Sequence, residues 1–417
     1  MDTYNIYKDI NARTQGEIYI GVVGPVRSGK STFIKHFAEK LILPFMSDGA
    51  GKERTKDELP QSAAGRTVMT TEPKFIPREA CVINPAQDIS MKIRLIDCVG
   101  FMIDGATGVV EDGKERLVKT PWYDYEIPFS EAAEFGTRKV IKDHSTVGIV
   151  MTTDGSIGEL PRDSYKAAEA ATIEELKKIG KPFVVVVNSK NPAAKSAAEC
   201  VDEIKKAYGA EAVSLDCEQL TLDDVNRTLE LLLNSFPING IEFYFDRWIE
   251  TLPDDNEIKQ AMVECAGQIL DRITYIKDFN KDSIKVENKY IEDVRSEPVD
   301  MADGIIRLSF KVDENLYYDM LSSIAGEKID NEYELINLIK EYAKEKSALS
   351  RYTSAIDTVR QKGYGVVSPS RDEISISEPE VIKNGGRYGV KIKAESPSYH
   401  MIKVNIGTEI APIVGSE

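Results

Sequence analysis

The amino-acid sequence predicts an α/β protein with a mostly parallel sheet, followed by a small α+β middle domain and an α+β C-terminal domain with a long helix. Three observations support this fold class. Short apolar strands alternate with helical patterns over residues 1–237, and this alternation is typical of a parallel sheet. The alternation stops after Pro237. A helix-forming stretch without proline or glycine then occupies residues 331–362.

The strands expected within residues 1–237 are short apolar runs. Such runs are uniformly hydrophobic because the strands of a parallel sheet are covered on both faces. The expected strands are residues 18–24, 92–97, 147–152, 183–188 and 212–215. The expected helices are residues 30–42, 128–143, 162–179 and 195–208, and a last helix that starts at a capping box of Thr221 and Asp224 and ends before Pro237.

A different pattern predicts the middle domain, residues 238–330. We expect a long amphipathic helix over residues 255–277, strands near 284–292 and 304–312, and a further helix over 313–325. In the first of these helices, apolar residues recur at helical spacing and predict one buried face. They are Ile258, Met262, Cys265, Ile269, Ile273 and Ile276.

The predicted C-terminal domain, residues 331–417, opens with the long helix over 331–362. A helix of this length usually protrudes from a compact domain or pairs beyond it, although ordinary packing within the domain is the alternative. A hairpin is expected over residues 381–392, because the turn Asn-Gly-Gly separates two apolar runs. The last expected strand is 401–406.

Composition excludes several classes of protein. Hydrophobic residues make up 42% and charged residues 29%, as in ordinary globular chains. No apolar run reaches the length of about 18 residues that a membrane span needs, and the polar N-terminus is unlike a secretory signal. The net charge of -16, without a basic block, disfavours nucleic acid as a partner. Five scattered cysteines and three distant histidines indicate a reduced, cytosolic protein without a zinc site.

Residues 24–31 (GPVRSGKS) match the phosphate-binding pattern GxxxxGK[ST] between an expected strand and an expected helix. Two glycines allow a tight turn whose N–H groups face phosphate oxygens, and the helix N-terminus favours negative charge. Lys30 would reach the β and γ phosphates, and Ser31 would place its hydroxyl on Mg²⁺. The motif therefore predicts a P-loop NTPase domain. The expected nucleotide-binding residues are Gly24, Pro25, Val26, Arg27, Ser28, Gly29, Lys30, Ser31 and Thr32, together with Gly100 and Asn188 from the two motifs below.

A second motif lies at the end of the strand expected over residues 92–97. Asp97 would hold Mg²⁺ through water, and Gly100, three residues later, would contact the γ-phosphate through its N–H group. This DxxG spacing is typical of the Ras and translation-factor GTPase class. A strand-end aspartate followed by a simple turn is the alternative, and the position some 65 residues after Lys30 favours the functional interpretation.

Threonines lie between these two motifs, at positions 67, 70 and 71. A threonine in this interval can coordinate Mg²⁺ and sense the γ-phosphate. Thr70 and Thr71 are therefore candidate catalytic residues beside Lys30 and Asp97, and Thr71 is a candidate metal ligand beside Ser31 and Asp97. Ordinary strand threonines are an equally good interpretation of position alone.

Two departures from the GTPase pattern affect the expected chemistry. Asn188 is followed by Ser-Lys-Asn, where that class has Lys-x-Asp. An asparagine at position 191 cannot offer a carboxylate to the two donors of guanine, so we expect ATP rather than GTP. Phe101 follows the DxxG motif, where a glutamine often orients the attacking water. Slow turnover is expected unless another group orients that water.

The sequence around these motifs resembles the stage IV sporulation protein A family. The matching segments are residues 21–35, 57–65, 69–75, 97–100, 120–123, 136–141, 153–158, 363–365 and 398–404. The likeness covers essentially the whole chain and is similar to clostridial members. Family chains usually continue for some tens of residues beyond the match to 411–415, so this chain is expected to be a C-terminally truncated form.

The resemblance implies a spore-coat ATPase of the mother-cell cytoplasm. Such a protein hydrolyses ATP, changes conformation and polymerises with itself into the basement layer on the outer forespore membrane. The resemblance gives Lys30 the Walker A role, Asp97 the Walker B role and Thr70 and Thr71 the sensor role. It also implies loss of guanine specificity around Asn188.

The same resemblance implies several partners. They are further copies of the chain, a small amphipathic membrane-anchoring coat peptide, a LysM-containing coat morphogenetic protein and other coat proteins. Because anionic lipid repels an acidic chain, the anchoring peptide would act as an adaptor. Two alternatives remain open from the residues alone: a GTPase-type regulatory switch, and a scaffold that nucleotide stabilises without turnover.

Overall fold

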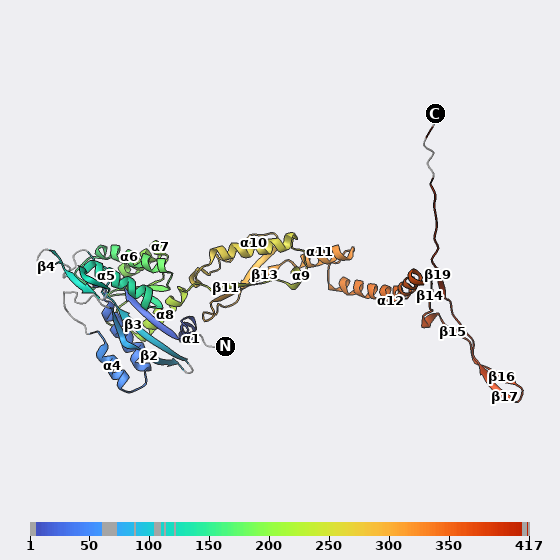
Figure 1. Ribbon diagram of the computed structural model, residues 1–417, viewed down its shortest axis with the longest axis horizontal. Coiled ribbons are helices and arrows are strands. Elements are labelled where there is room, and N and C mark those ends of the chain that lie inside the picture. The colour runs from blue at the N-terminus through green and yellow to red at the C-terminus, as the bar shows by residue number, and fades with distance from the viewer. Residues whose placement is uncertain are drawn as a thin grey trace. The chain divides into compact units, whose positions relative to one another are not determined.

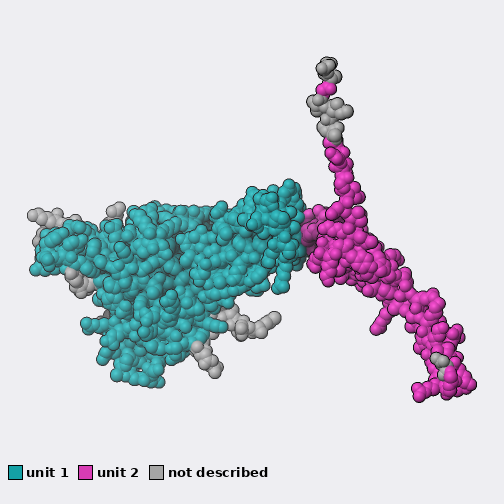
Figure 2. All heavy atoms as spheres, turned by 45° about the vertical axis from the view of Figure 1, so that its right-hand side comes forward, with its two compact units in different colours: residues 1–313 teal, residues 314–417 magenta. Residues whose placement is uncertain are grey.

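The structure is a computed structural model that describes residues 6–60, 73–86, 89–103, 110–111, 114–120, 122–410 and 415. Two compact units make up the chain, residues 1–313 and residues 314–417, shown in different colours in Figure 2. The first unit holds the large sheet and all the motifs discussed above. The predicted domain boundaries after residues 237 and 330 remain predictions.

A six-stranded sheet forms the centre of the first unit (Figure 1). Its strand order is β10-β9-β8-β1-β3-β2, and every neighbouring pair is parallel except β2 with β3. The strands are β1 Glu17–Val23, β2 Lys74–Ala86, β3 Ile89–Asp97, β8 Val147–Thr153, β9 Phe183–Asn188 and β10 Ala212–Leu215. The mixed α/β fold with a mostly parallel sheet is confirmed. All five strands expected for this sheet are present, and β2 was not foreseen.

Helices cover both faces of this sheet. They are α1 Ile6–Arg13, α2 Lys30–Phe37 with its π-helical continuation Ala38–Ile42, α5 Phe129–Lys139 with its π-helical continuation Val140–His144, α6 Asp163–Ile179, α7 Lys195–Tyr208 and α8 Leu222–Asn234. One face packs Phe33 and Leu229, from α2 and α8, against strand residues such as Val22. The other face packs Leu176 of α6 and Ile204 of α7 in a separate buried cluster.

Glycine ends two of these helices, and the expected capping box begins a third. Helix α6 ends at Gly180 and helix α7 ends at Gly209, both with positive φ, which glycine adopts without strain. Helix α8 begins at the expected capping box, in which the Asp224 N–H donates to the Thr221 hydroxyl and the Thr221 N–H donates to the Asp224 carboxylate.

Smaller elements complete the described part of residues 1–237. They are α3 Leu43–Phe45, α4 Ala50–Glu58, the paired strands β4 Val110–Glu111 and β5 Lys114–Glu115, and the paired strands β6 Leu117–Thr120 and β7 Tyr123–Pro128. None of these small strands joins the six-stranded sheet.

A three-stranded sheet of order β11-β13-β12 follows, within the same unit. Its elements are β11 Gly240–Tyr244, α9 Arg247–Glu250, α10 Glu257–Arg272, a 3-10 turn Ile276–Asp278, β12 Ile291–Ser296 and β13 Ile305–Val312. Five of the six residues predicted for the buried helix face are buried, Ile258 being only partly so. The predicted end of α10 was wrong, because the chain is already extended at Ile273. The strand expected from residue 284 begins only at Ile291, after a turn in which the Asn288 side chain accepts from the Tyr290 N–H.

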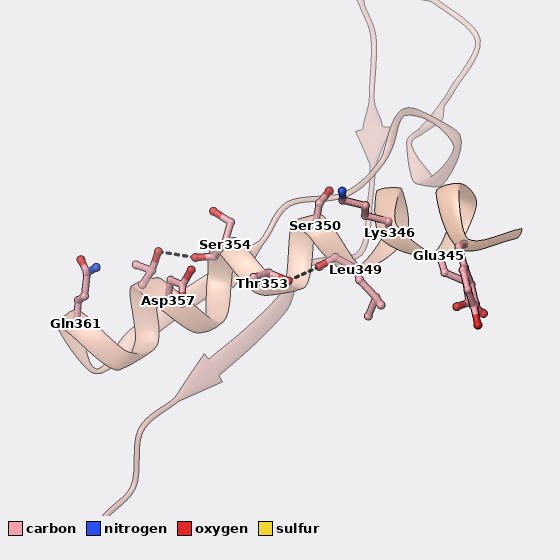
Figure 3. Close-up of a pocket in the computed structure, with 10 residues that line it drawn as sticks. Glu345, Lys346, Leu349, Ser350, Thr353, Ser354, Asp357 and Gln361 are labelled. Atoms are coloured by element: carbon pink, nitrogen blue, oxygen red, sulfur yellow. Dashed lines mark hydrogen bonds between the residues drawn. The ribbon is translucent and has the colours of Figure 1, made fainter. Parts of the chain in front are cut away.

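The second unit contains α11 Glu314–Ala325 and the long helix α12 Glu332–Lys362, which matches the expected helix closely. The Asn331 side chain caps its start, and Gly363, at φ 81°, ends it. Along α12 only Ala355 is fully buried, so most of this helix is not packed within its own unit. A groove of about 830 Å³ follows one face of α12 and is lined by residues of that helix alone (Figure 3).

Short strand pairs complete the second unit. They are β14 Tyr364–Val367 with β19 Tyr399–Ile402, β15 Ser375–Ile376 with β18 Ala394–Glu395, and β16 Glu380–Asn384 with β17 Arg387–Lys391. A 3-10 turn, Arg371–Glu373, precedes β15. The predicted hairpin is therefore present, whereas the last expected strand ends at Ile402 rather than at residue 406. None of the helices in the described ranges is both long enough and apolar enough to cross a bilayer.

Candidate functional site

The loop of residues 24–31, called the glycine loop below, joins the end of β1 to the start of α2. It lies at the carboxyl edge of the sheet, where ligands bind in open α/β folds. Gly24 has φ 128° and Gly29 has φ 92°. A Cβ atom at Gly24 would lie 2.2 Å from the Met151 carbonyl oxygen, and one at Gly29 would lie 2.1 Å from Asn188 Nδ2. Backbone conformation and close packing therefore both require glycine at these two positions.

Lys30 begins α2 and is only 6% exposed. Its ammonium donates hydrogen bonds to the carbonyl oxygens of Pro25 at 2.7 Å and Gly24 at 3.3 Å. Burial lowers the pKa of Lys30, because a charged group is disfavoured away from water. The glycine loop thus encloses a cation that it contacts only with neutral carbonyl groups. Phosphate oxygens are stronger acceptors for such a cation.

Asp97 ends β3, and Ser31 lies in the first turn of α2. The Ser31 hydroxyl donates to Asp97 Oδ2 at 2.7 Å. Burial raises the pKa of Asp97, and the Ser31 hydrogen bond and the Lys30 charge act in the opposite direction. Asp97 Oδ1 is buried and has no hydrogen-bond partner among the described residues. A buried carboxylate oxygen without a partner needs a further ligand.

These two oxygen donors fit the requirements of Mg²⁺. That ion is usually held by one or two protein oxygens together with water and substrate phosphates. Within the described residues no group of three or more His, Cys, Asp or Glu side chains could form a metal cage. Ser31 and Asp97 are therefore suited to an ion that arrives with a phosphate ligand.

Gly100 and Phe101 connect the DxxG segment to the glycine loop. A Cβ atom at Gly100, which has φ 92°, would lie 2.1 Å from the Gly24 carbonyl oxygen and 2.6 Å from Lys30 Nζ. The Phe101 N–H donates to the Gly24 carbonyl, and the Val26 N–H donates to the Phe101 carbonyl. The Phe101 ring packs in a buried apolar cluster with Val26 and Tyr165. Phe101 therefore supports the loop by packing, and its ring offers nothing that could orient water.

Asn188 ends β9 and is 4% exposed. Its Nδ2 donates to the Ser28 carbonyl at 3.2 Å, and its Oδ1 accepts from the Cys217 N–H at 3.2 Å. Asn188 thus fastens the glycine loop to the segment that follows β10. The Ser28 hydroxyl, which is fully buried, adds a bond of 2.9 Å to the Pro25 carbonyl.

We expect Asn188→Ala to loosen the glycine loop, because two buried groups, the Ser28 carbonyl and the Cys217 N–H, would lose their partner. The free energy of unfolding should fall by about 1–3 kcal/mol and ATP affinity by roughly tenfold. Thermal unfolding and titration with a fluorescent ATP analogue measure the two effects. Asn405→Ala, at an exposed position in the second unit, is the control and should change neither quantity. Unchanged stability in the Asn188 variant would contradict the anchoring role.

Asp154 was not predicted as part of the site, yet it accepts a hydrogen bond from Ser189, the residue that follows Asn188. It follows β8, and its Oδ2 accepts from the Ser189 hydroxyl at 2.7 Å, while its Oδ1 accepts from Ser156. Partial burial raises the pKa of Asp154, but hydrogen bonds from Ser156 and Ser189 outweigh it and leave this pKa lowered. The available signal was an acidic residue directly after an apolar strand, the same pattern as at Asp97.

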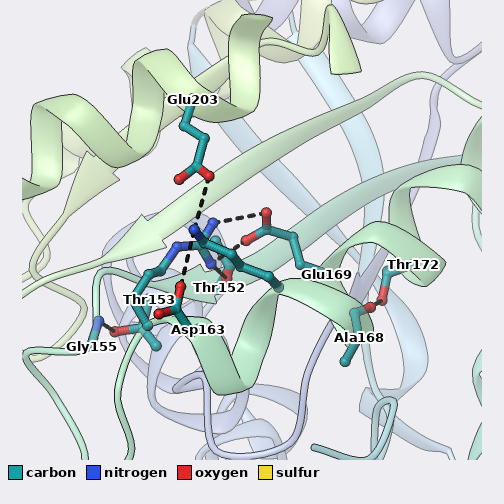
Figure 4. A network of polar contacts seen from close by, with 10 residues as sticks. Thr152, Thr153, Gly155, Asp163, Ala168, Glu169, Thr172 and Glu203 are labelled. Carbon is teal, nitrogen blue, oxygen red and sulfur yellow. Dashed lines mark hydrogen bonds and ion pairs between the residues drawn. The ribbon is translucent and has the colours of Figure 1, made fainter. Parts of the chain in front are cut away.

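A buried ion pair fixes the segment between β8 and α6 (Figure 4). Arg162 donates to both carboxylate oxygens of Glu169, at 2.6 and 2.9 Å, and to the Thr152 hydroxyl at 3.0 Å. Glu169 is 1% exposed, so the pair is shielded from water. Gly155 lies against it, since a Cβ atom there would lie 2.9 Å from the Arg162 backbone nitrogen. The spacing of seven residues, which places two side chains on one helix face, was the only sequence signal.

The remaining predicted residues divide into two groups. Thr32 is half-buried in the first turn of α2, and Arg27 is exposed in the glycine loop with φ 61°, a conformation that costs a non-glycine residue about 1 kcal/mol. Thr67, Thr70 and Thr71 lie outside the described residues. The structure thus brings the glycine loop, Asp97, Gly100 and Asn188 together at one edge of the sheet.

A mostly parallel α/β sheet with a GxxxxGKS loop at its carboxyl edge is consistent with an ATPase domain. The fold and the site therefore define the class of this protein as an ATPase. Residues 1–237 match the family model of the ATPase domain of stage IV sporulation protein A, and residues 238–415 match that of its middle domain.

Three relatives agree with these matches. The chain is 42% identical over 415 residues to stage IV sporulation protein A of Clostridioides difficile (strain 630), which covers 99% of this chain and 84% of that protein. It is 39% identical to the Bacillus subtilis (strain 168) protein and 38% identical to the Bacillus anthracis protein, with 100% of this chain and 85% of each relative covered. The chain therefore belongs to the stage IV sporulation protein A family, as the resemblance predicted. Its first part is an ATPase domain of that family, which implies nucleotide binding and ATP hydrolysis in a sporulation protein.

Proposed function

We propose that this chain binds ATP with Mg²⁺ at the glycine loop, hydrolyses it, and uses the resulting conformational change to polymerise with itself. The polymer would form the basement layer of the spore coat, on the mother-cell side of the outer forespore membrane. The observation that carries the chemistry is the meeting of Lys30, Ser31 and Asp97 at one edge of a parallel sheet. The family membership supports the cellular role.

Each residue at this edge has a defined part in the proposed mechanism. The N–H groups of the glycine loop bind phosphate oxygens, and the Lys30 ammonium exchanges the Gly24 and Pro25 carbonyls for the β and γ phosphates. Ser31 and Asp97 would hold Mg²⁺. When bound there, Mg²⁺ neutralises charge on the phosphate oxygens. Thr70 and Thr71, assigned from the family resemblance, would sense the γ-phosphate, with Thr71 as a further metal ligand.

The proposed preference for ATP rests on what surrounds Asn188. The amide of Asn188 already bonds the Ser28 carbonyl and the Cys217 N–H, which leaves its second Nδ2 hydrogen as the one donor it can offer to a base. Residue 191 is an asparagine and offers no carboxylate for guanine. A GTPase-type switch, which the sequence alone left open, would need such a carboxylate.

The proposed partners are further copies of the chain, the small amphipathic membrane-anchoring coat peptide, the LysM-containing coat morphogenetic protein and other coat proteins. Assembly is supported by the second unit, where α12 is largely exposed and the β16–β17 hairpin presents apolar side chains to solvent. In that hairpin, Val381 and Tyr388 are each 73% exposed. Apolar area of this kind is characteristic of surfaces that another protein covers.

A scaffold that binds nucleotide without turnover is the second candidate function. The observation that favours it is the buried ring of Phe101, at the position where a glutamine often orients water. The two candidates differ in one measurable quantity, the release of phosphate.

Sedimentation of the purified chain with different nucleotides tests the proposal. We expect pelletable polymer and phosphate release with ATP and Mg²⁺, and neither with a non-hydrolysable ATP analogue, with GTP, or with ATP and a chelator. Polymer formed equally well with the analogue would favour the scaffold without turnover. A clear preference for GTP would favour the regulatory switch and overturn the proposed base preference.

A further inference from the structure

Arg27 is the fourth residue of the glycine loop, and its backbone is left-handed. Among the described residues, the non-glycine positions with positive φ are Gln15, at 55°, and Arg27, at 61°. Gln15 lies in the exposed turn between α1 and β1. Arg27 instead stands between Val26 and Ser28, which are both buried. A conformation that glycine adopts freely, held by an arginine in a phosphate-binding motif, indicates a function for the side chain.

The position of Arg27 within the loop separates it from the metal-binding oxygens. β1, which leads into the glycine loop, lies between β3 and β8. Asp97 ends β3, on one side of the loop. Arg27 is the fourth residue of the loop and its side chain is exposed, whereas Ser31 is the eighth and last. The neighbouring Val26 packs with Tyr165 in the first turn of α6, and the charge of Arg27 lowers the pKa of that tyrosine, which burial raises. A triphosphate bound along the glycine loop would therefore meet the exposed Arg27 at the middle of the loop and the Ser31–Asp97 oxygens at its end.

The reaction requires positive charge at the phosphates, and within the glycine loop Lys30 and Arg27 are the residues that carry it. In ATP hydrolysis a water oxygen bonds to the γ-phosphorus while the bond from that phosphorus to the β,γ-bridging oxygen breaks. The bond's electron pair stays on the β-phosphate of ADP, and both protons of the water leave with the phosphate product as H2PO4−. Charge thus builds up on the bridging oxygen and the β-phosphate, and an arginine supplied within the same chain can stabilise it.

We propose that Arg27 is a catalytic residue whose guanidinium contacts the triphosphate and stabilises the charge that develops as the β,γ bond breaks. This inference rests on the proposed function, namely that ATP is hydrolysed at the glycine loop. It assigns to Arg27 a role in the transition state rather than in holding ATP. It also explains why the loop keeps an arginine where glycine would avoid backbone strain.

Three variants of the full chain separate charge, shape and backbone effects: Arg27→Gly, Arg27→Gln and Arg27→Lys. We expect the glycine and glutamine variants to lower kcat for phosphate release by about 100-fold or more, with KM for ATP changed by less than roughly threefold. The lysine variant should retain an intermediate kcat because it keeps the charge but not the planar fork. Aluminium fluoride should tighten ADP binding in the wild-type chain and not in Arg27→Gly, while ADP alone binds both equally.

Controls make the outcome decisive. Arg27→Gly should unfold at a temperature no lower than the wild type, because glycine accepts φ 61° without strain. Gln15→Gly, at the other left-handed position, is the matched backbone control and should hydrolyse ATP normally. An unchanged kcat in the glycine and glutamine variants, or an equal loss of ADP binding with and without aluminium fluoride, would overturn the inference. A wild-type chain that releases no phosphate would instead overturn the proposed function on which it rests.

Discussion

Lys30→Ala should abolish ATP hydrolysis, reducing phosphate release by about 100-fold or more. The reason is that Lys30 places a positive charge inside the glycine loop, 2.7 Å from the Pro25 carbonyl and 3.3 Å from the Gly24 carbonyl. Alanine removes this charge from the place that faces the β and γ phosphates. A steady-state phosphate-release assay at saturating ATP measures the effect.

The same variant should remain folded, which makes the assay interpretable. The Gly24 carbonyl keeps its bond from the Phe101 N–H, and the Pro25 carbonyl keeps its bond from the Ser28 hydroxyl. No buried acceptor is therefore left without a partner, and the removed group is one that burial disfavours. Lys40→Ala, an exposed lysine that follows α2, is the matched control and should leave the rate unchanged. A normal rate in Lys30→Ala would rule out the glycine loop as the site of hydrolysis.

Asp97→Asn should have the second largest effect, a loss of Mg²⁺-dependent hydrolysis of about 100-fold or more. Asparagine has nearly the same shape and can still accept the bond from Ser31, so the change removes charge and little else. The buried Oδ1 atom, which has no partner in the described structure, would no longer carry the negative charge that a hard cation prefers. Phosphate release measured over a range of Mg²⁺ concentrations tests this expectation.

Stability should change in the opposite direction to activity in this variant. Burial raises the pKa of Asp97, so its ionised form is less favourable in the folded chain than in the unfolded chain. Such a group favours folding most at low pH, and that contribution is lost as the pH rises through the raised pKa. At neutral pH an uncharged asparagine should therefore be tolerated at least as well, with an equal or higher unfolding temperature. Asp143→Asn, at an exposed position, is the control for hydrolysis, and a fully active Asp97→Asn enzyme would exclude the metal-binding role.

The parallel part of the sheet could be predicted because each of its strands is a continuous apolar run. The β2 strand could not, because it carries Pro77 and Pro85 and pairs at the edge of the sheet, where proline is tolerated. Its register also shifts against β3 between Ile76 and Cys81, which breaks any regular alternation. The β14 strand was missed for another reason. Its partner, β19, lies far along the chain, so no turn sequence next to β14 indicates that the two strands pair.

In the site, too, the residues within local motifs could be predicted, whereas the contacts between residues far apart in the sequence could not. Lys30, Ser31 and Asp97 belong to motifs whose spacing predicts which residues lie beside them, so we could expect these three to lie close together. The bond from Asn188 to Ser28 joins residues 160 positions apart, and the sequence suggested only a degenerate base-reading motif there. The buried Arg162–Glu169 pair was likewise unpredictable, because charged residues on a helix are ordinarily solvated.

The two hydrogen bonds of Asn188 have a consequence for how this family could change its nucleotide. The asparagine anchors the glycine loop through its bonds to Ser28 and Cys217, and it does so whichever base is bound. Asn191 makes neither of these bonds and its side chain is exposed, so a substitution at that position would leave the glycine loop anchored. Where the base preference is set at position 191, it can change by single substitutions without passing through a form that fails to fold.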